Sequence, residues 1–396
     1  MTMLKIDLFP QVLKIEDSAQ KRSCLIQQTT VNDTIIEKEL WFLYPTELSL
    51  PEDHNCDSYL LAVLLPAMQM KANIIVHGSV SSELLANLTE LQHVWKKWCP
   101  EQFFLVDIEV ERVREKEGRV EGAILAFSGG ADAQFSAYRH ATGKVRYGTQ
   151  LLKAGIFIHG FDISISDKKG FSGAQCLANH ALKDLQLSLF IVRTNIRELW
   201  DINWENYFGS ALASVLCAFS KYAGTGLIAS GPSYDELFMP MGDHPMLDPM
   251  LSSGEFKIMH DGCGFNRSEK IKIISRWSSG VSNLRVCWEG AESNRNCGRC
   301  EKCVRTRLNF LVAGISDPAC FSSPLNKEIL KNMRLSSSFV VLEWERICDE
   351  MIAVGIDDKW VEQVQKVIKR GPPLAFLFPE GSGRRMWVKK MLMRNK

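Results

Sequence analysis

The chain has 396 residues, which is more than one small core needs and predicts two or three domains. Its 47 Lys and Arg residues balance 46 Asp and Glu residues, so no overall field attracts it to nucleic acid or to a membrane surface. The first residues lack the long apolar run of a signal peptide, and the most apolar stretch elsewhere, 59–70, is short and contains Pro66. We therefore expect a cytoplasmic protein that does not enter a membrane.

The 12 cysteines are distributed unevenly. Eight stand alone and are most simply small core residues, whereas the other four fall within residues 287–303. A chain without an export signal is expected to keep its thiols reduced, so clustered cysteines indicate a metal site better than disulfides.

Residues 1–118 are expected to form an α+β module. Alternating or apolar runs at 39–44, 73–76 and 103–113 predict strands, and the apolar spacing of 58–71 and 82–98 predicts helices. The module shows no cluster of catalytic residue types, and a charged, Gly-containing stretch at 112–119 marks its end.

From residue 120 onward, strand and helix signals alternate. Strands are expected at 124–127, 154–160, 187–194 and 225–230, with helices at 133–140, 173–187 and 204–221. This alternation is typical of an α/β fold with a parallel sheet and helices on both faces. Ligands of such sheets bind beyond the carboxyl ends of the strands, near the point where the strand order reverses.

The first of these strands runs into a Gly-Gly turn and then a helix. Gly129 and Gly130 allow a tight turn with outward-facing N–H groups, and free amides at a helix N-terminus bind anions. The pattern has neither the Gly-Lys-Ser/Thr ending of a Walker A loop nor the GxGxxG of a dinucleotide site. The candidate phosphate-binding residues are Ser128, Gly129, Gly130, Ala131 and Asp132.

The same edge of the sheet is expected to gather residues 159–162, 193–195 and 230–235. Ser230, at the end of the fourth strand, is a further candidate for binding the nucleotide, and the loop that follows, 231–249, contains prolines and glycines that prevent long regular structure. Loops in this position commonly bind a second substrate, so Asp235, His244 and Asp248 are candidates for orienting it. The alternative is an ordinary solvated surface loop.

Four cysteines, Cys287, Cys297, Cys300 and Cys303, include two CxxC spacings that share Cys300. Thiolates at this spacing grip one tetrahedral ion, and a four-cysteine shell without an open position is typical of structural zinc. An iron–sulfur cluster uses the same four ligands, and a redox CxxC pair is the other alternative. The helix expected at 304–312 starts at this site. It is therefore expected to hold Arg305 and Arg307 near the crevice.

After Pro318 the pattern predicts helices at 325–333, 339–354 and 359–369, followed by a basic tail at 383–396 that can touch a partner. The chain is thus divided into an α+β module at 1–118, a nucleotide-binding domain with the metal site at 119–315, and a helical region at 316–396.

The loop from Ser128 to Asp132 resembles the SGGxDS loop of the PP-loop enzymes, which split ATP into AMP and pyrophosphate. Together with the four cysteines, it makes residues 120–315 similar to the 7-cyano-7-deazaguanine synthases. The full layout looks like the longer members of this family in bacterial defence operons, including the Qat type. The chain departs from the family in two ways. Ala133 replaces the last Ser of the loop, and the family's Tyr-Pro-Asp-Cys-Arg substrate motif is absent after the fourth strand.

The resemblance implies ATP, Mg²⁺ and structural Zn²⁺ as cofactors. It places Ser128, Gly129, Gly130 and Asp132 at the pyrophosphate and its Mg²⁺, and Ile158 and His159 near the adenine. It implies adenylation of a carboxylate or carbonyl oxygen on a deazapurine-like substrate, followed by attack of a nitrogen nucleophile. It also implies an acceptor that is either a small molecule or carried by a protein, and it implies protein partners encoded in the same operon.

Two other functions are consistent with the sequence. Ala133 favours an ATP-binding scaffold or sensor subunit of a defence complex with little turnover. Nucleic-acid modification is the third, and the neutral charge balance gives it little support.

Overall fold

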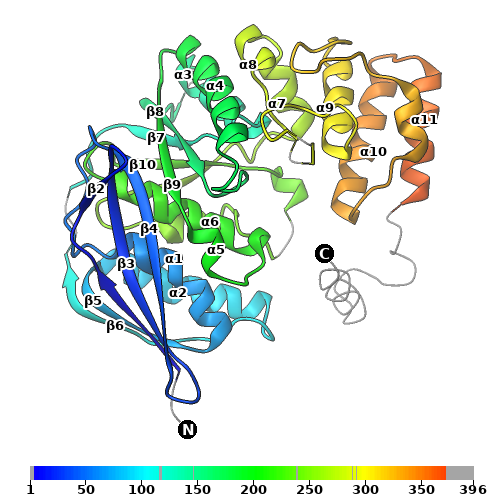
Figure 1. Cartoon of the computed structure of the whole chain (residues 1–396). Coiled ribbons are helices and arrows are strands. Elements are labelled where there is room, and N and C mark those ends of the chain that lie inside the picture. Colours follow the sequence, from blue (N-terminus) through cyan, green and yellow to red (C-terminus); the bar gives the residue numbers. More distant parts are fainter. Residues whose placement is uncertain are drawn as a thin grey trace. The chain divides into compact units, whose positions relative to one another are not determined.

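The computed structural model describes residues 4–115, 118–145, 147–237, 240–287, 289–290 and 292–371. The chain forms two compact units (Figure 1). Unit 1 comprises Met1–Asn266 and Asn283–Arg285, and unit 2 comprises Arg267–Ser282 and Val286–Lys396. The division differs from the three expected segments, because unit 1 holds both the first segment and most of the second.

Unit 1 is built on one mixed sheet, in which the described residues form eleven strands (Figure 1). The strand order is β11-β10-β7-β8-β9-β4-β3-β1-β5-β6, with β2 paired to β3. The strands are β1 (Lys5–Pro10), β2 (Lys14–Glu16), β3 (Ala19–Thr29), β4 (Ile35–Pro45), β5 (Asn73–Ser81), β6 (Ile108–Arg114), β7 (Ala123–Ala126), β8 (Leu152–His159), β9 (Ser188–Thr194), β10 (Thr225–Ala229) and β11 (Lys257–Asp261).

The five strands from β7 to β11 run parallel to one another. Chain order proceeds from β7 through β8 to β9 on one side, while β10 and β11 lie on the other side of β7. The strand order therefore reverses between β7 and β10, which is where an open α/β sheet binds its ligands.

The amino-terminal strands continue the same sheet, because β4 pairs antiparallel with β9 through Phe42 and Thr194. Asn195 secures this junction: its Oδ1 accepts from the N–H of Trp41 at 3.0 Å, and its Nδ2 donates to the carbonyl of Glu39 at 2.7 Å. The α+β module is thus part of the body that carries the Gly-Gly loop.

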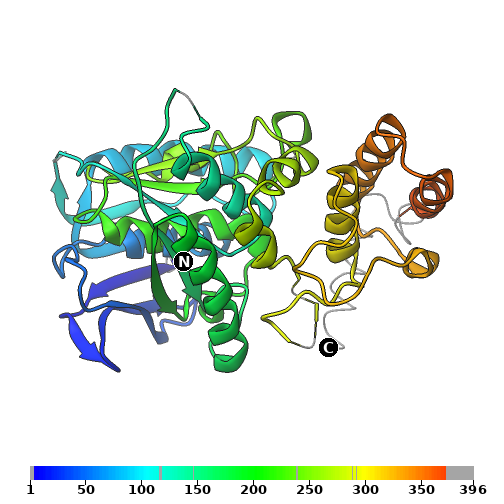
Figure 2. The same cartoon turned by 90° about the horizontal axis from the view of Figure 1, so that it is seen from above.

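Helices cover both faces of the parallel strands (Figure 2). The helices of unit 1 are α1 (Asp57–Met70), α2 (Ser82–Trp98), α3 (Ala131–Ala141), α4 (Lys168–Asp184), α5 (Ile196–Leu199) and α6 (Trp204–Leu216), with 3-10 turns η1 (Cys217–Phe219), η2 (Tyr234–Glu236) and η3 (Asp248–Leu251). Residues of β8 pack on opposite faces of the sheet. Phe157 belongs to an apolar cluster with residues of α4, whereas Ile156 and Ile158 belong to the core that includes residues of α1 and α6. The predicted α/β class with helices on both faces is confirmed.

Pro66 lies inside α1, where it cannot donate to the carbonyl of Ala62. The Tyr207 hydroxyl on α6 donates to that carbonyl at 2.5 Å and replaces the missing bond. Both Tyr207 and Ala62 are fully buried, so the two helices are joined by a hydrogen bond that the proline makes necessary.

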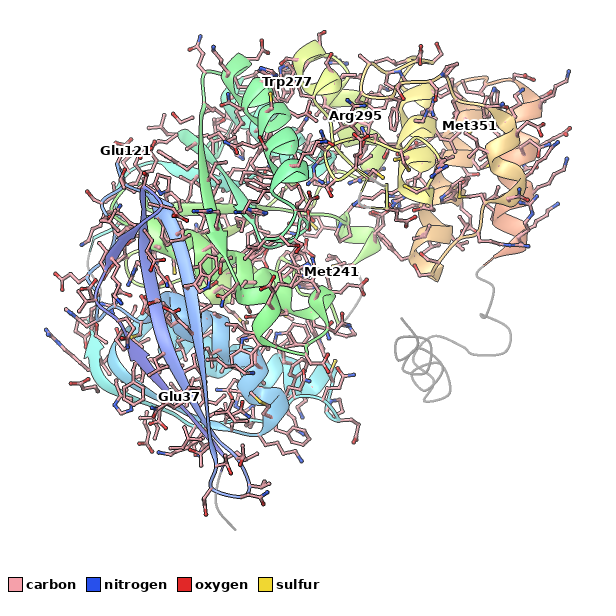
Figure 3. The ribbon with its side chains drawn as sticks, in the orientation of Figure 1. Glu37, Glu121, Met241, Trp277, Arg295 and Met351 are labelled. Carbon is pink, nitrogen blue, oxygen red and sulfur yellow. The ribbon has the colours of Figure 1, made fainter. Side chains whose placement is uncertain are left out.

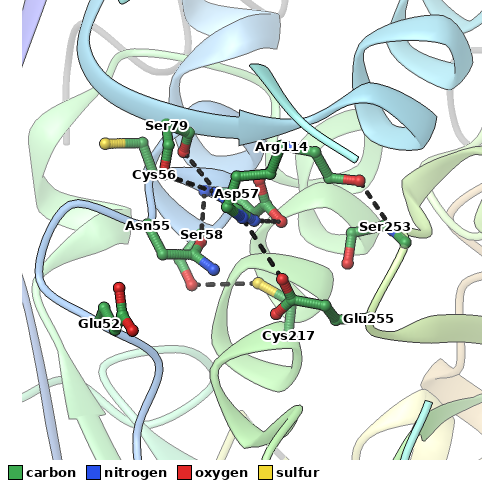
Figure 4. A network of polar contacts seen from close by, with 12 residues as sticks. Glu52, Asn55, Cys56, Asp57, Ser58, Ser79, Arg114, Cys217, Ser253 and Glu255 are labelled. Carbon is green, nitrogen blue, oxygen red and sulfur yellow. Dashed lines mark hydrogen bonds and ion pairs between the residues drawn. The ribbon is translucent and has the colours of Figure 1, made fainter. Parts of the chain in front are cut away.

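A buried ion-pair network lies at the start of α1 (Figure 4). Arg114 donates to the Asp57 carboxylate at 2.8 Å and to the carbonyl of Ser79 at 2.8 Å, and its Nε lies 3.4 Å from Glu255. Burial raises the pKa of Asp57, although Arg114 favours the ionised form. The network joins β6 to the loop before β11 through charges that have little access to water.

We expect Arg114→Met to lower the free energy of unfolding by about 3 kcal/mol, because it leaves two buried carboxylates without their cation. Arg119→Met is the matched control: Arg119 pairs with Glu83 where both side chains are more than a quarter exposed, so its loss should cost about 1 kcal/mol or less. Urea denaturation at constant m-value measures both. Equal midpoints for the two variants would contradict the assigned role of the network.

Unit 2 is helical in its described part. It contains α7 (Arg267–Ile274), α8 (Ser278–Ser282), α9 (Glu301–Val312), η4 (Lys327–Asn332), α10 (Ser338–Ala353) and α11 (Asp358–Arg370). Leu308, Trp344 and Val364 belong to its core.

The helices predicted at 339–354 and 359–369 match α10 and α11, whereas 325–333 contains a 3-10 turn. The basic tail predicted at 383–396 lies outside the described residues. Within the described parts of the chain, no helix is long and apolar enough to cross a bilayer.

Candidate active site and metal centre

The Gly-Gly loop leaves the carboxyl end of β7 and enters α3. Gly129 has φ +75°, a conformation that favours glycine, and a Cβ there would meet no atom within 4 Å. The N–H of Gly130 lies 3.3 Å from the Ser128 hydroxyl, and Ser128 itself is exposed. Since α3 begins at Ala131, the loop presents main-chain donors at a helix N-terminus beside open space.

Asp261 at the end of β11 fixes the direction of α3. It accepts from the Ser136 hydroxyl at 2.6 Å and from His140 Nε2 at 3.1 Å, and it forms an ion pair with Arg139. Burial alone would raise the pKa of Asp261, but His140, Arg139 and Ser136 together lower it to about 2. His140 Nδ1 accepts from the N–H of Gln150, which assigns the proton to Nε2.

Two carboxylates lie at the switch point, one from each side. Asp132 is in the first turn of α3, and Asp243 lies in the loop after β10, accepting from the N–H of Gly231 at 3.4 Å. Asp243 is 5 % exposed, and burial raises its pKa well above the usual range, with further contributions from Asp248 and Asp132. The two side chains are therefore close enough to interact electrostatically.

Close packing of two glycines positions Asp243. A Cβ on Gly209 of α6 would lie 2.0 Å from the carbonyl oxygen of Gly242, and one on Gly242 would lie 2.6 Å from that of Glu205. The N–H of Gly242 donates to the Glu205 carbonyl at 2.8 Å. The loop, marked by Met241 in Figure 3, lies directly on α6 for this reason.

Asp248 is fully buried and binds His260 of β11, with Oδ2 2.8 Å from Nδ1. Its other oxygen accepts from the N–H of His244 at 3.3 Å. His244 stacks edge-on against Trp98, accepts from the N–H of Met246, and has its pKa lowered by burial and by His260. Asp248 thus holds His260 and the loop backbone, and we assign it no direct contact with an acceptor.

The other predicted residues of this loop have local partners. The Ser230 side chain is buried and donates to the carbonyl of Pro232. Ser233 and Glu236 form a capping box around η2, and the Ser233 hydroxyl lies 2.7 Å from Asp235. Of these residues, Asp235 is exposed at the carboxyl edge of the sheet.

His159 and Ile158 end β8, as expected for residues near the nucleotide. His159 is 3 % exposed, stacks on Phe171 at 4.0 Å and donates from Nε2 to the carbonyl of Ser164 at 2.9 Å. Burial lowers its pKa, so the ring is neutral. Its side chain shapes this end of the strand, which leaves the main chain of Ile158 and His159 for any contact with a base.

Arg285 was not predicted from the sequence, yet it lies on the Gly-Gly loop. Its N–H donates to the carbonyl of Gly129 at 3.0 Å, and its Nη2 lies 3.3 Å from the carbonyl of Ser128. The guanidinium is 3.9 Å from Asp162, and the side chain is 6 % exposed. No local motif marks it, because its partners are more than 120 positions away in the chain.

In unit 2 the four predicted cysteines come together. One ligand atom from each of Cys287, Cys297, Cys300 and Cys303 lies within 4.8 Å of all the others. The sulfur atoms of Cys287 and Cys300 are 3.8 Å apart, as are those of Cys297 and Cys303. Hydrogen bonding with Cys303 lowers the pKa of Cys300, which favours the thiolate form that binds metal. This donor set fits a tetrahedral Zn²⁺.

The loop around the cysteines, marked by Arg295 in Figure 3, is fixed by polar contacts. Asn296 Oδ1 accepts from the N–H groups of Val286 and Cys287 at 2.8 and 3.2 Å. Arg307 is 1 % exposed, donates to the carbonyl of Gly298 and lies over the ring of Phe321. Arg305 forms ion pairs with Glu301 and Glu343. Both arginines therefore have structural contacts inside unit 2.

Comparisons of the chain with protein-family models, with curated proteins and with solved structures found no match.

Proposed function

We propose that this chain is an ATP-dependent enzyme that forms AMP and pyrophosphate. It adenylates a carboxylate or carbonyl oxygen of a deazapurine-like acceptor, and a nitrogen nucleophile then displaces AMP. One observation carries the proposal: the Gly-Gly loop at the start of α3 meets two carboxylates, Asp132 and Asp243, where the strand order reverses.

The two carboxylates fit Mg²⁺. Magnesium is typically bound by one or two carboxylates together with substrate phosphates, and Asp132 in the first turn of α3 is close enough to Asp243 to interact with it electrostatically. Bound Mg²⁺ would neutralise charge on the leaving pyrophosphate. Asp243 must lose its proton to act as a ligand, which the metal charge favours.

In the first step, an acceptor oxygen attacks the α-phosphorus and the bond between the α-phosphorus and its bridging oxygen breaks, so that pyrophosphate leaves with the bonding electrons. The main-chain donors at the N-terminus of α3 and the dipole of this helix stabilise the departing charge. In the second step, the nitrogen nucleophile bonds to the activated carbon, loses a proton and releases AMP. Asp235, exposed at this edge, and His244, kept neutral by burial, are the candidates for orienting the acceptor.

The four-cysteine centre has a structural role in this proposal. All four thiols take part in the cluster, so a tetrahedral ion bound there keeps no position for water or substrate. A zinc ion at this site would fix the start of α9, where Cys303 lies in the first turn.

The direct test is incubation of the purified chain with ATP, Mg²⁺ and candidate deazapurine carboxylic acids, with AMP and pyrophosphate quantified. We expect AMP and pyrophosphate in equal amounts, and loss of both by about 100-fold or more in Asp132→Ala. AMP formation that is unchanged in this variant, or absent with every acceptor, would refute the proposed reaction.

A second candidate is an ATP-binding scaffold or sensor with little turnover. Ala133 favours it, since this residue is 4 % exposed in the first turn of α3 and offers no hydroxyl to phosphate. The missing hydrogen bond is worth about 1 kcal/mol, which weakens binding without abolishing it. Tight ATP binding without AMP formation in the same assay would select this function.

A further inference from the structure

We propose that Arg22 and the first turn of α1 bind a small monovalent inorganic anion, of the size of chloride, inside unit 1. The site goes beyond the proposed function, which makes no use of these residues. The proposal rests on a buried cation that has no acidic partner and on buried donors beside it that have no acceptor.

Arg22 of β3 is a buried cation with only neutral contacts. The residue is 3 % exposed. Its Nη2 donates to the main-chain carbonyls of Glu52 at 3.2 Å and Asn55 at 2.9 Å, and its Cζ lies 5.6 Å from the centre of the Tyr59 ring. Among the described residues, no carboxylate forms an ion pair with the guanidinium, and Nη1 has no hydrogen-bond partner. A guanidinium keeps its charge, and a buried charge is costly unless it is paired.

The buried carboxylates of the same core have a different cation. Asp57 accepts from Arg114 at 2.8 Å and from the N–H of Ser81 at 2.9 Å. Glu255 pairs with Arg114 as well. These contacts direct Asp57 toward β5 and β6, so that Arg22 is left without a direct counter-ion.

The start of α1 adds further donors next to Arg22. The carbonyls that bind Arg22 belong to the loop that leads into this helix, where Glu52 and Asn55 are labelled in Figure 4. The N-cap residue Cys56 makes no side-chain cap, and in the described chain the N–H groups of Ser58 and Tyr59 have no acceptor. A helix N-terminus carries partial positive charge, which repels a guanidinium and attracts an anion.

The hydroxyl of Tyr59 is also without a partner. Tyr59 is 1 % exposed, and its hydroxyl makes no hydrogen bond with the described residues. The hydroxyl is nevertheless close to Arg22, because the guanidinium opposes the rise in the Tyr59 pKa that burial causes. One anion held between Arg22 Nη1 and this hydroxyl would satisfy both buried groups.

The surroundings favour a monovalent anion over phosphate. One guanidinium compensates one negative charge, and the thiols near Arg22 contribute none. Burial raises the pKa of Cys56 and of Cys217 to about 12, so both thiols are neutral. A phosphate dianion would therefore bring a buried charge that nothing here compensates.

The test is the chloride dependence of the stability of the full chain. Urea denaturation is followed while chloride is varied over about two decades, with gluconate keeping the ionic strength constant. In the wild-type chain, we expect the ratio of unfolded to folded chain to fall by up to about tenfold for each tenfold rise in chloride above its dissociation constant. Arg22→Gln should show less than about a twofold change, because it removes the charge that binds the anion. General salt effects act on both chains alike.

Tyr59→Phe keeps the ring and removes only the unpartnered hydroxyl, so it tests the site even if Arg22→Gln does not fold. It should require about tenfold more chloride for the same stabilisation. Tyr44→Phe is the matched control, since Tyr44 is fully buried in the same core and its hydroxyl already donates to the carbonyl of Val215 at 3.2 Å. It should keep the chloride dependence of the wild-type chain.

Crystals of the chain grown in sodium bromide locate the anion, since bromide scatters anomalously. We expect a peak within hydrogen-bond distance of Arg22 Nη1 and the Tyr59 hydroxyl. Chloride dependence that is equal in the wild-type chain and both site variants would overturn the inference. Absence of a bromide peak would also overturn it and would assign a water molecule to these donors.

Discussion

Asp243→Asn is expected to reduce AMP formation by about 100- to 1000-fold while the chain remains folded. Asparagine keeps the shape of the carboxyl group and its contact with the N–H of Gly231, but it cannot provide the negative charge that Mg²⁺ needs. The assay is the rate of AMP release at saturating ATP, with Mg²⁺ varied. Added Mg²⁺ should restore little activity if Asp243 is a direct ligand.

The fold should tolerate this substitution. The pKa of Asp243 in the folded chain lies well above its unfolded value, so the ionised form is disfavoured by folding. The folded chain therefore has its full stability at low pH, where this carboxyl is protonated in both states. Part of that stability is lost as the pH rises from the unfolded pKa to the folded pKa. Asparagine mimics the protonated acid at every pH, and the variant should be at least as stable as the wild-type chain near neutrality.

The same shift predicts the pH dependence of metal binding. Because Mg²⁺ must displace the proton of Asp243, the apparent Mg²⁺ affinity of the wild-type chain should tighten by roughly tenfold per pH unit below that pKa. The slope should disappear in Asp243→Asn. Asp235→Asn is the control, since Asp235 is exposed and lies in the first turn of η2, and the metal binding of this variant should retain the wild-type slope. A wild-type affinity that does not change with pH would exclude Asp243 as a ligand.

The elements that the sequence predicts well are those with a regular apolar pattern. The helix expected at 82–98 matches α2, and the strands expected from 124 to 230 correspond to β7, β8, β9 and β10. β3 gave no such signal because Gln20 and Arg22 are buried on it, where they donate to the carbonyls of Leu48 and Asn55. Because these hydrogen-bond partners lie far along the chain, the sequence around β3 shows no alternation of apolar residues that would predict a strand.

β11 was missed for a related reason. His260 and Asp261 occupy two of its five positions, and both make polar contacts. His260 binds Asp248, and Asp261 binds residues of α3.

The residues of the candidate site could likewise be predicted only in part. The Gly-Gly motif located Ser128 to Asp132, but the burial of Asp243 depends on the approach of Gly209 to Gly242, and Arg285 reaches the loop only after the sheet has formed. Local motifs identify a loop, whereas its charged neighbours are assigned by tertiary structure.

Loss of the metal ion should have the largest effect on unit 2. We expect about one Zn²⁺ per purified chain, and we expect chelation or Cys300→Ser to lower the free energy of unfolding by roughly 5 kcal/mol or more. Four thiols drawn within 4.8 Å of one another repel as thiolates without a cation, and Cys300 and Cys303 begin α9, whose Leu308 packs in the core of the unit. Elemental analysis and urea denaturation with and without chelator measure the two quantities.

Cys320→Ser is the matched control, since Cys320 is a thiol of the same unit whose pKa burial raises to about 12, and it lies outside the cluster. The control should keep its zinc and lose about 1 kcal/mol or less, because serine is nearly isosteric with cysteine. Iron with visible absorption in place of zinc would indicate an iron–sulfur cluster bound by the same four cysteines. An unchanged unfolding midpoint after complete removal of metal would show that the cysteines pack as neutral thiols and that unit 2 is stable without an ion.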